Sequence, residues 1–162
     1  MQLMQAKDEA VARSLLSKKM IFISIDNEGE CFVDDKQVKI KTFTDLFAWR
    51  EGHKLVLLIY EETKRFPKEE VFGLVSQMRR AAISITSNIA EGFGRHGYKE
   101  KIQFYYLAQG SLTEIKNQII TAKDIGYTTQ EKFKELMDQA DVAHKFLQGL
   151  IAKSKTFLNL KS

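Results

Sequence analysis

The sequence predicts a mainly α-helical protein, an antiparallel up-down-up-down four-helix bundle preceded by a small N-terminal α/β extension. Three observations lead to this fold class. The chain has one proline in 162 residues, where average usage would give roughly eight, and helix interiors exclude proline. Apolar residues recur at spacings of three and four from Thr44 onward. Short loops separate the four helical stretches, which makes consecutive helices antiparallel.

Residues 1–41 are predicted to form the N-terminal extension, a short helix followed by a β-meander. Residues 4–19 have the pattern of a short amphipathic helix. Three short apolar runs follow at 21–25, 31–33 and 38–40, separated by segments rich in Asn, Asp and Gly, which is typical of short strands joined by turns. Three short strands alone are marginally stable in water, so we expect them to pack on something, for example another subunit.

Residues 42–162 are predicted to form the bundle. Pro67 is a favoured first-turn residue and opens the second helix, while Gly92 and Gly94 end it. Thr128 and Glu131 form a Thr-x-x-Glu capping box at the start of the fourth helix. The first three helices are predicted at about 44–65, 67–94 and 98–125. The fourth is predicted to open at Thr128, with an apolar face that extends to Ile151.

Composition excludes several classes of protein. A single cysteine, Cys31, cannot form a disulfide framework or a thiolate metal cluster within one chain. No run approaches the roughly 20 apolar residues that span a bilayer. Charges interrupt the N-terminus where a signal peptide would be apolar. We therefore expect a soluble, cytoplasmic protein with no membrane partner.

Two motifs have the form of enzyme or cofactor sites, and each has a simpler interpretation. Residues 92–97 match G-x-G-x-x-G, but a dinucleotide site needs a strand before it. A long helical pattern precedes it here, so a glycine-rich turn between helices is favoured. Asp141 and His144 approximate one of the two Glu-x-x-His pairs that a di-metal bundle requires. We predict no catalytic residue, no metal and no cofactor, and expect that the protein is not an enzyme.

A polar stripe runs beside the apolar face of the predicted second helix. A solvated face is typically richer in Lys and Glu, so this composition favours hydrogen bonds that set the register of closely packed helices or subunits. A surface that contacts a ligand or RNA, and an ordinary solvated surface, are the alternatives. The stripe consists of Arg80, Ser84, Ser87, Asn88 and Glu91.

Basic residues with aromatic neighbours gather around the predicted turn between the second and third helices. Lys and Arg supply phosphate contacts, and unpaired bases stack on aromatic rings; a solvated loop is the alternative. Residues 42–162 carry the whole net charge of +4, because residues 1–41 contain seven basic and seven acidic side chains. The candidates for nucleic-acid binding are Arg79, Arg95, His96, Lys99 and Lys101.

Three sequence blocks resemble the 23S rRNA-intervening-sequence proteins, small bacterial four helix bundle proteins also labelled S23. They are residues 43–50, 60–67 and 77–95, the last with Arg-Arg-Ala-Ala followed by Ser-Asn-Ile-Ala-Glu-Gly. Residues 104–114 resemble the third-helix signature of the family, so the resemblance covers roughly 43–152. Thr86 stands where the family pattern has Pro, and we therefore expect a less kinked helix here. Residues 1–41 lie outside the pattern.

The resemblance implies a homopentameric bundle. It also implies similarity to the accessory variability proteins of diversity-generating retroelements, which are basic pentamers that bind nucleic acid and a reverse transcriptase. A pentamer of this chain would carry a formal charge of about +20. We therefore predict a non-enzymatic oligomeric scaffold that binds RNA or a nucleoprotein near the turn between the second and third helices. The alternative is a structural or protein-interaction module whose N-terminal extension docks a partner or a neighbouring subunit.

Overall fold

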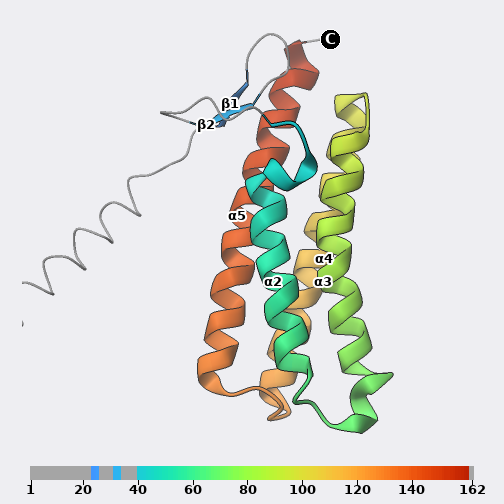
Figure 1. Ribbon diagram of the computed structural model, residues 1–162, viewed down its shortest axis with the longest axis vertical. Helices are drawn as coiled ribbons and strands as arrows, with labels where there is room; N and C mark the ends of the chain where they lie inside the picture. The colour runs from blue at the N-terminus through green and yellow to red at the C-terminus, as the bar shows by residue number, and fades with distance from the viewer. Residues whose placement is uncertain (1–22, 26–30, 34–39, 161–162) are drawn as a thin grey trace, which may run out of the picture. The chain divides into compact units, whose positions relative to one another are not determined.

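The structure is a computed structural model that describes residues 23–25, 31–33 and 40–160 (Figure 1). The chain divides into two units, residues 1–40 and 41–162. In the first unit, strand β1 (Ile23–Ile25) pairs antiparallel with strand β2 (Cys31–Val33). The second unit contains all the helices that the structure describes.

The fold class predicted for the N-terminal extension is wrong. A meander needs three strands, and the described part of this unit has a single ladder of two three-residue strands. Ile40, which ends the third predicted run, is not in a strand. Three residues in alternation are too few to distinguish a strand from irregular chain. The helix predicted at 4–19 and residues 34–39 lie outside the described residues, so the described chain is a helical bundle without a meander.

The second unit is an antiparallel bundle in which each long helix packs on two neighbours (Figure 1). The helix pairs in contact are α2 with α3, α3 with α4, α4 with α5, and α5 with α2. Short 3₁₀ turns precede α2 and join it to α3. The elements are η1 (Phe43–Asp45), α2 (Phe47–Thr63), η2 (Lys68–Val71), α3 (Leu74–Gly94), α4 (Tyr98–Asp124) and α5 (Gln130–Leu160).

Helix α3 begins at Leu74, seven residues later than predicted, because η2 follows Pro67. The carboxylate of Glu70 explains this start. Its Oε2 accepts a hydrogen bond from the Leu74 N–H at 2.8 Å, which satisfies one of the four N–H groups that a helix leaves unpaired at its N-terminus. Gly73 occupies the N-cap position and contributes no side chain, so the acidic side chain of η2 caps α3 from outside it.

Helix α5 begins at Gln130, two residues later than predicted, and runs to Leu160, beyond the last residue of its predicted apolar face, Ile151. Thr129, not Thr128, accepts the hydrogen bond from the Lys132 N–H, at 3.3 Å. Thr128 is instead buried, with 5% of its surface exposed. A hydroxyl near a helix start can cap it only when it faces the free N–H groups, so burial of Thr128 shifts the cap by one residue.

The core is formed largely by apolar residues at the predicted helical spacing. Val71 and Leu107, which the spacing also places inward, are instead 49% and 57% exposed. The largest side chains in the core are aliphatic, and each is less than 2% exposed. Burying a side chain of this kind contributes roughly 1.5–3 kcal/mol relative to leaving it in water, so these residues supply most of the drive to form the bundle. They are Leu55, Ile59, Met78, Ile85, Ile89, Leu112, Ile115, Ile119, Leu136 and Leu147.

Two glycines let α3 approach both of its neighbours closely. A Cβ atom on Gly92 would lie 2.6 Å from Tyr105 Cε1 of α4, and one on Gly52 of α2 would lie 3.3 Å from Ile85 Cγ2 of α3. The close contact between α3 and α4 therefore requires glycine at position 92.

Thr86 of α3 keeps the backbone N–H that proline would remove, and α3 is one uninterrupted helix from Leu74 to Gly94.

We expect Gly92→Ala to destabilise the protein by about 1–3 kcal/mol, because the added methyl must displace the Tyr105 ring. Gly149→Ala is the matched control, since nothing lies within 4 Å of a Cβ at this position in α5. Alanine there should stabilise the helix by up to about 1 kcal/mol. Chemical denaturation of both variants measures the difference, and equal stabilities would contradict the close contact.

Candidate nucleic-acid interface

Two basic side chains at the turn between α3 and α4 are held against aromatic rings. The Arg95 guanidinium carbon lies 4.5 Å from the centroid of the Phe104 ring. Lys101 Nζ lies 5.5 Å from the centroid of the Phe93 ring and donates to the Phe93 carbonyl oxygen at 2.6 Å. Arg95 also lies 3.8 Å from the Glu91 carboxylate. Contacts of this kind hold a cation in place while leaving much of its charge directed to solvent.

His96 and Lys99 complete the predicted basic cluster at this turn. Both are exposed, and neither side chain forms an ion pair with the described residues. Glu100 is the acidic residue within the segment from Arg95 to Lys101. The turn therefore presents two held cations and two side chains that are free to meet a ligand.

The C-terminal part of α5 adds two further lysines to this end of the bundle. The rings of Tyr98 and Phe157 stack with centroids 5.2 Å apart, which ties α5 to the start of α4. Lys153 Nζ lies 5.4 Å from the Phe157 ring, and Lys155 Nζ lies 5.3 Å from the Tyr106 ring. These lysines were not among the predicted candidates, because they are more than 50 residues from the turn in the sequence. The predicted antiparallel topology would have indicated them, since it places the end of α5 beside the start of α4.

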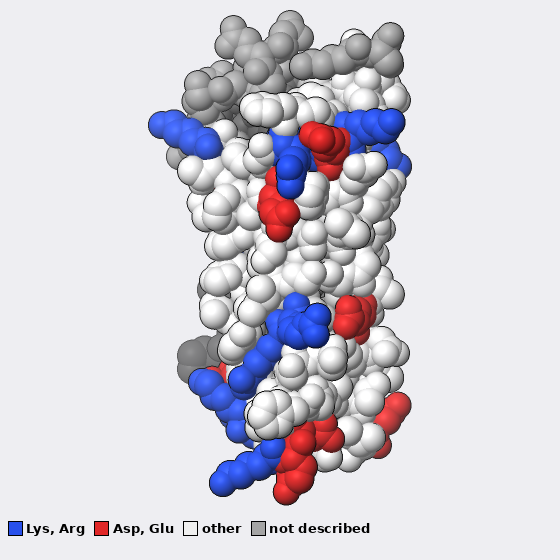
Figure 2. All heavy atoms as spheres, turned by 90° about the vertical axis from the view of Figure 1, so that its right-hand side faces the viewer, with Lys and Arg blue, Asp and Glu red and all other residues white. Residues whose placement is uncertain are grey.

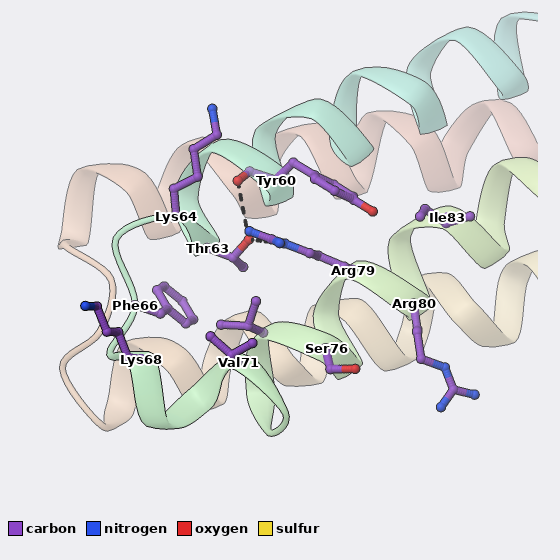
Figure 3. Close-up of a pocket in the computed structure, with 11 residues that line it drawn as sticks. Tyr60, Thr63, Lys64, Phe66, Lys68, Val71, Ser76, Arg79, Arg80 and Ile83 are labelled. Carbon is purple, nitrogen blue, oxygen red and sulfur yellow. Dashed lines mark hydrogen bonds between the residues drawn. The ribbon is translucent and has the colours of Figure 1, made fainter.

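Arg79 does not belong to this cluster. It lies sixteen residues before Arg95 on α3, which corresponds to about 24 Å along a helix axis. Its Nε donates to Thr63 Oγ1 at 2.9 Å, and its guanidinium carbon lies 4.8 Å from the centroid of the Tyr60 ring. Figure 3 shows Arg79 against α2 near the connection to α3, so the structure divides the predicted basic set between two ends of the bundle.

Three serine and asparagine side chains join α3 to α4 at mid-height. Asn88 Nδ2 donates to the Ser84 carbonyl oxygen at 2.8 Å and lies 3.0 Å from Ser84 Oγ. Ser84 Oγ in turn lies 2.8 Å from Ser111 Oγ of α4. The centre of the polar stripe is thus a hydrogen-bonded network within one subunit. The other members differ from it, because Arg80 and Ser87 are exposed and Glu91 pairs with Arg95.

An uncharged band crosses the face formed by α3 and α4. It comprises residues 81–90 and 102–113, which include no Lys, Arg, Asp or Glu. Figure 2 shows charged side chains gathered toward the two ends of this face, with a broad band between them that lacks charge. Ile83 and Leu107 of the band are 43% and 57% exposed. Exposed apolar side chains within an uncharged region are typical of a surface that contacts another protein.

A family model described as 23S rRNA-intervening sequence protein matches residues 44–149, well over half of the chain. The chain belongs to this family. A crystal structure of a protein of unknown function from the S23 ribosomal protein family of Bacteroides thetaiotaomicron is similar to it, with a TM-score of 0.61 and 19% sequence identity. The match covers 65% of this chain and 95% of that chain. A comparison with curated proteins finds none that matches.

This likeness shows that the family member shares the fold of the solved protein. The match covers nearly all of that protein but leaves about a third of this chain unmatched. None of the helices among the described residues is long and apolar enough to cross a membrane. The similarity to accessory variability proteins stays a prediction.

Asp141 and His144 of this family member connect α5 to α4. Asp141 forms an ion pair with Lys116, and His144 Nε2 lies 3.1 Å from Gln109 Nε2. Burial lowers the pKa of His144, the charge of Lys116 lowers it further, and the charge of Asp141 opposes both effects. The described residues include no group of three or more His, Cys, Asp or Glu that could hold a metal ion. Each of these two side chains thus has a partner on the neighbouring helix.

The lowered pKa of His144 predicts a loss of stability in acid. Because the folded state holds this imidazole below its ordinary pKa, its neutral form contributes stability above about pH 6.5, and that contribution falls as the pH decreases. In His144→Gln, an amide replaces the imidazole as the hydrogen-bonding partner of Gln109. The melting temperature of this variant should decrease less between neutral and mildly acidic buffer than that of the wild type. His96→Gln, on the exposed turn, is the control and should follow the wild type. If the melting temperatures of all three proteins changed with pH in the same way, His144 would not be the source of the acid sensitivity.

Proposed function

We propose that this protein is a cytoplasmic, non-enzymatic, oligomeric helical scaffold that binds RNA or a nucleoprotein. The observation that carries the proposal is the concentration of basic side chains at one end of the bundle. We name this cluster the basic end. It consists of Arg95, His96, Lys99, Lys101, Lys153 and Lys155.

The way these cations are held supports binding of a phosphate backbone. Four of them rest on aromatic rings that belong to α3, α4 and α5. A side chain that is already restrained loses less conformational entropy when a ligand immobilises it. Tyr106, under Lys155, is 45% exposed and offers a ring on which an unpaired base can stack. Contacts to phosphate combined with stacking suit single-stranded RNA.

Assembly would strengthen the attraction. We propose that the uncharged band contacts a second copy of the chain and that the copies form a homopentamer. Each copy would then repeat the basic end around the symmetry axis, and the summed formal charge would be about +20. Several weak contacts on one assembly bind a long ligand more tightly than any single contact does.

The alternative function is a structural or protein-interaction module whose N-terminal extension docks a partner or a neighbouring subunit. The uncharged band supports this alternative as well as it supports the RNA-binding scaffold, because an exposed apolar surface can contact another protein whether or not RNA is bound. The two functions differ in what the basic end does. Under the alternative it is a solvated surface, and RNA should not bind to it even at low salt.

Removing two positive charges from the basic end should weaken RNA binding in a salt-dependent manner. For Lys99→Gln with Lys155→Gln, we expect the slope of log affinity against log salt to decrease in magnitude by about 1.4, since each phosphate contact on a single strand contributes about 0.7. Fluorescence anisotropy of a labelled single-stranded RNA over a salt series measures this slope.

The control for this experiment is Lys134→Gln with Lys145→Gln, two exposed lysines of α5 outside the basic end. It removes the same charge and should keep the wild-type slope. Absence of binding at low salt, or binding that does not depend on salt, would rule out the phosphate contacts. An equal decrease in both double variants would show only a general effect of net charge.

A charge placed in the uncharged band should dissociate the oligomer. Burying an unpaired carboxylate at a subunit contact is strongly unfavourable, so Ile83→Asp should convert the assembly to single chains. Native mass spectrometry measures this, with the wild type expected at five times the 18.7 kDa chain. Val142→Asp, at a site 40% exposed on α5, should leave the mass unchanged. A monomeric wild type would refute the pentamer.

A further inference from the structure

A pocket of about 420 Å³ lies between the C-terminal part of α2, η2 and the start of α3 (Figure 3). Its wall has an unusual charge composition, because four of its residues are basic and none is acidic. This is the end of the bundle away from the α3–α4 turn. The basic residues are Lys64, Lys68, Arg79 and Arg80.

Arg79 is held in this pocket by two contacts that leave its charge unpaired. Thr63 Oγ1 donates its proton to the Ile59 carbonyl oxygen at 2.8 Å, so its lone pair accepts the hydrogen bond from Arg79 Nε at 2.9 Å. The Tyr60 ring supports the plane of the guanidinium. No acidic residue in the described part of the chain forms an ion pair with Arg79. The terminal N–H groups of a fixed guanidinium are therefore available to an anion.

The remaining walls supply further charge, a hydroxyl and an apolar surface. Figure 3 shows Lys64 and Lys68 at one side of the pocket and Arg80 at the other, with Ser76 between Arg80 and Val71. Lys64 pairs with the exposed Glu61 at 2.7 Å, but an exposed pair of this kind contributes little and yields readily to a stronger partner. Phe66, which is 7% exposed, forms part of the apolar wall.

We propose that this pocket binds a phosphate monoester, as found on a nucleotide or at the 5′ end of an RNA. Guanidinium groups bind phosphate through two parallel hydrogen bonds. A monoester carries about −1.5 to −2 charges at neutral pH, whereas a phosphodiester within a chain carries one, so a wall whose charged residues are all basic favours the monoester. The apolar wall has room for the sugar or base that the phosphate carries, since the volume lies in the range of small-molecule sites.

The pocket is distinct from the basic end. The two lie about 24 Å apart along α3, by the rise of the helix between Arg79 and Arg95. The inference rests on the proposed RNA binding only for the source of the phosphate. A free nucleotide would occupy the pocket in the same way, so the two ideas can fail separately.

The test compares ligands that differ only in the phosphate. One pair is a short single-stranded RNA with a 5′-phosphate and the same RNA with a 5′-hydroxyl; the other is adenosine monophosphate and adenosine. We expect the phosphorylated member of each pair to bind at least about tenfold more tightly to the wild type, a difference of about 1.4 kcal/mol. Arg79→Gln should abolish this preference. Arg79→Lys should retain only part of it, because an ammonium group cannot donate the two parallel hydrogen bonds that a guanidinium donates.

Lys145→Gln is the control, because it removes one exposed charge from α5 about 22 Å along the helix from its first residue, Gln130, and it should keep the full preference. If Arg79→Gln fails to fold by circular dichroism, Lys68→Gln with Arg80→Gln tests the same pocket through two exposed side chains. Equal binding of the members of each pair would overturn the proposal while leaving RNA binding intact. Binding of adenosine monophosphate without any RNA binding would support the pocket and refute the proposed RNA function. Equal competition by succinate would identify a carboxylate site and overturn the phosphate assignment.

Discussion

The close approach of α3 to α4 is the contact on which the rest of the molecule depends. Gly92 has no side chain where the Tyr105 ring lies, and Ser84 meets Ser111 across the same interface at mid-height. Long side chains would hold the two helices farther apart, and packing at this distance leaves no room for them. The small and short polar residues at this interface between α3 and α4 are therefore required by the packing of the two helices.

The same part of α3 and α4 also lacks charged side chains. The uncharged band excludes Lys, Arg, Asp and Glu from residues 81–90 and 102–113, so the charged side chains of these helices concentrate toward their ends (Figure 2). At one end, the chain reversal after Gly94 brings the start of α4 beside the end of α5. At the other, η2 contributes Lys68 to the wall of the pocket that Arg79 also lines. The bundle thus has two separate basic regions on a chain whose net charge is only +4.

Much of this fold could be predicted from the sequence, because helical periodicity is a strong local signal. The four helices and their buried aliphatic residues follow from spacings of three and four. The helix starts could not be predicted reliably, since Glu70 and Thr129 act as caps only through their three-dimensional placement. The meander was wrong for a related reason: three-residue patterns contain too little information to define a strand.

The grouping of the basic residues was predicted only in part, and the difference has a physical cause. Arg79 and Arg95 lie in one continuous sequence block, but a helix converts sixteen residues into about 24 Å, which separates them. Lys153 is distant in sequence and becomes a neighbour through the antiparallel return of α5. Residues on one helix can therefore be assigned to a face from sequence, whereas membership of an end cluster depends on which helix ends meet.

The surroundings of the two arginines also differ, although each rests on an aromatic ring. Arg95 has the Glu91 carboxylate 3.8 Å away, and both side chains are about half exposed, so an incoming phosphate must displace this carboxylate. Arg79 has a neutral hydroxyl as its partner, and a hydroxyl does not neutralise its charge. Exposed ion pairs weaken as salt rises, and so do exposed phosphate contacts. The basic end thus suits extended, weak and salt-sensitive contacts repeated over an assembly, whereas the environment of Arg79 suits a single compact anion.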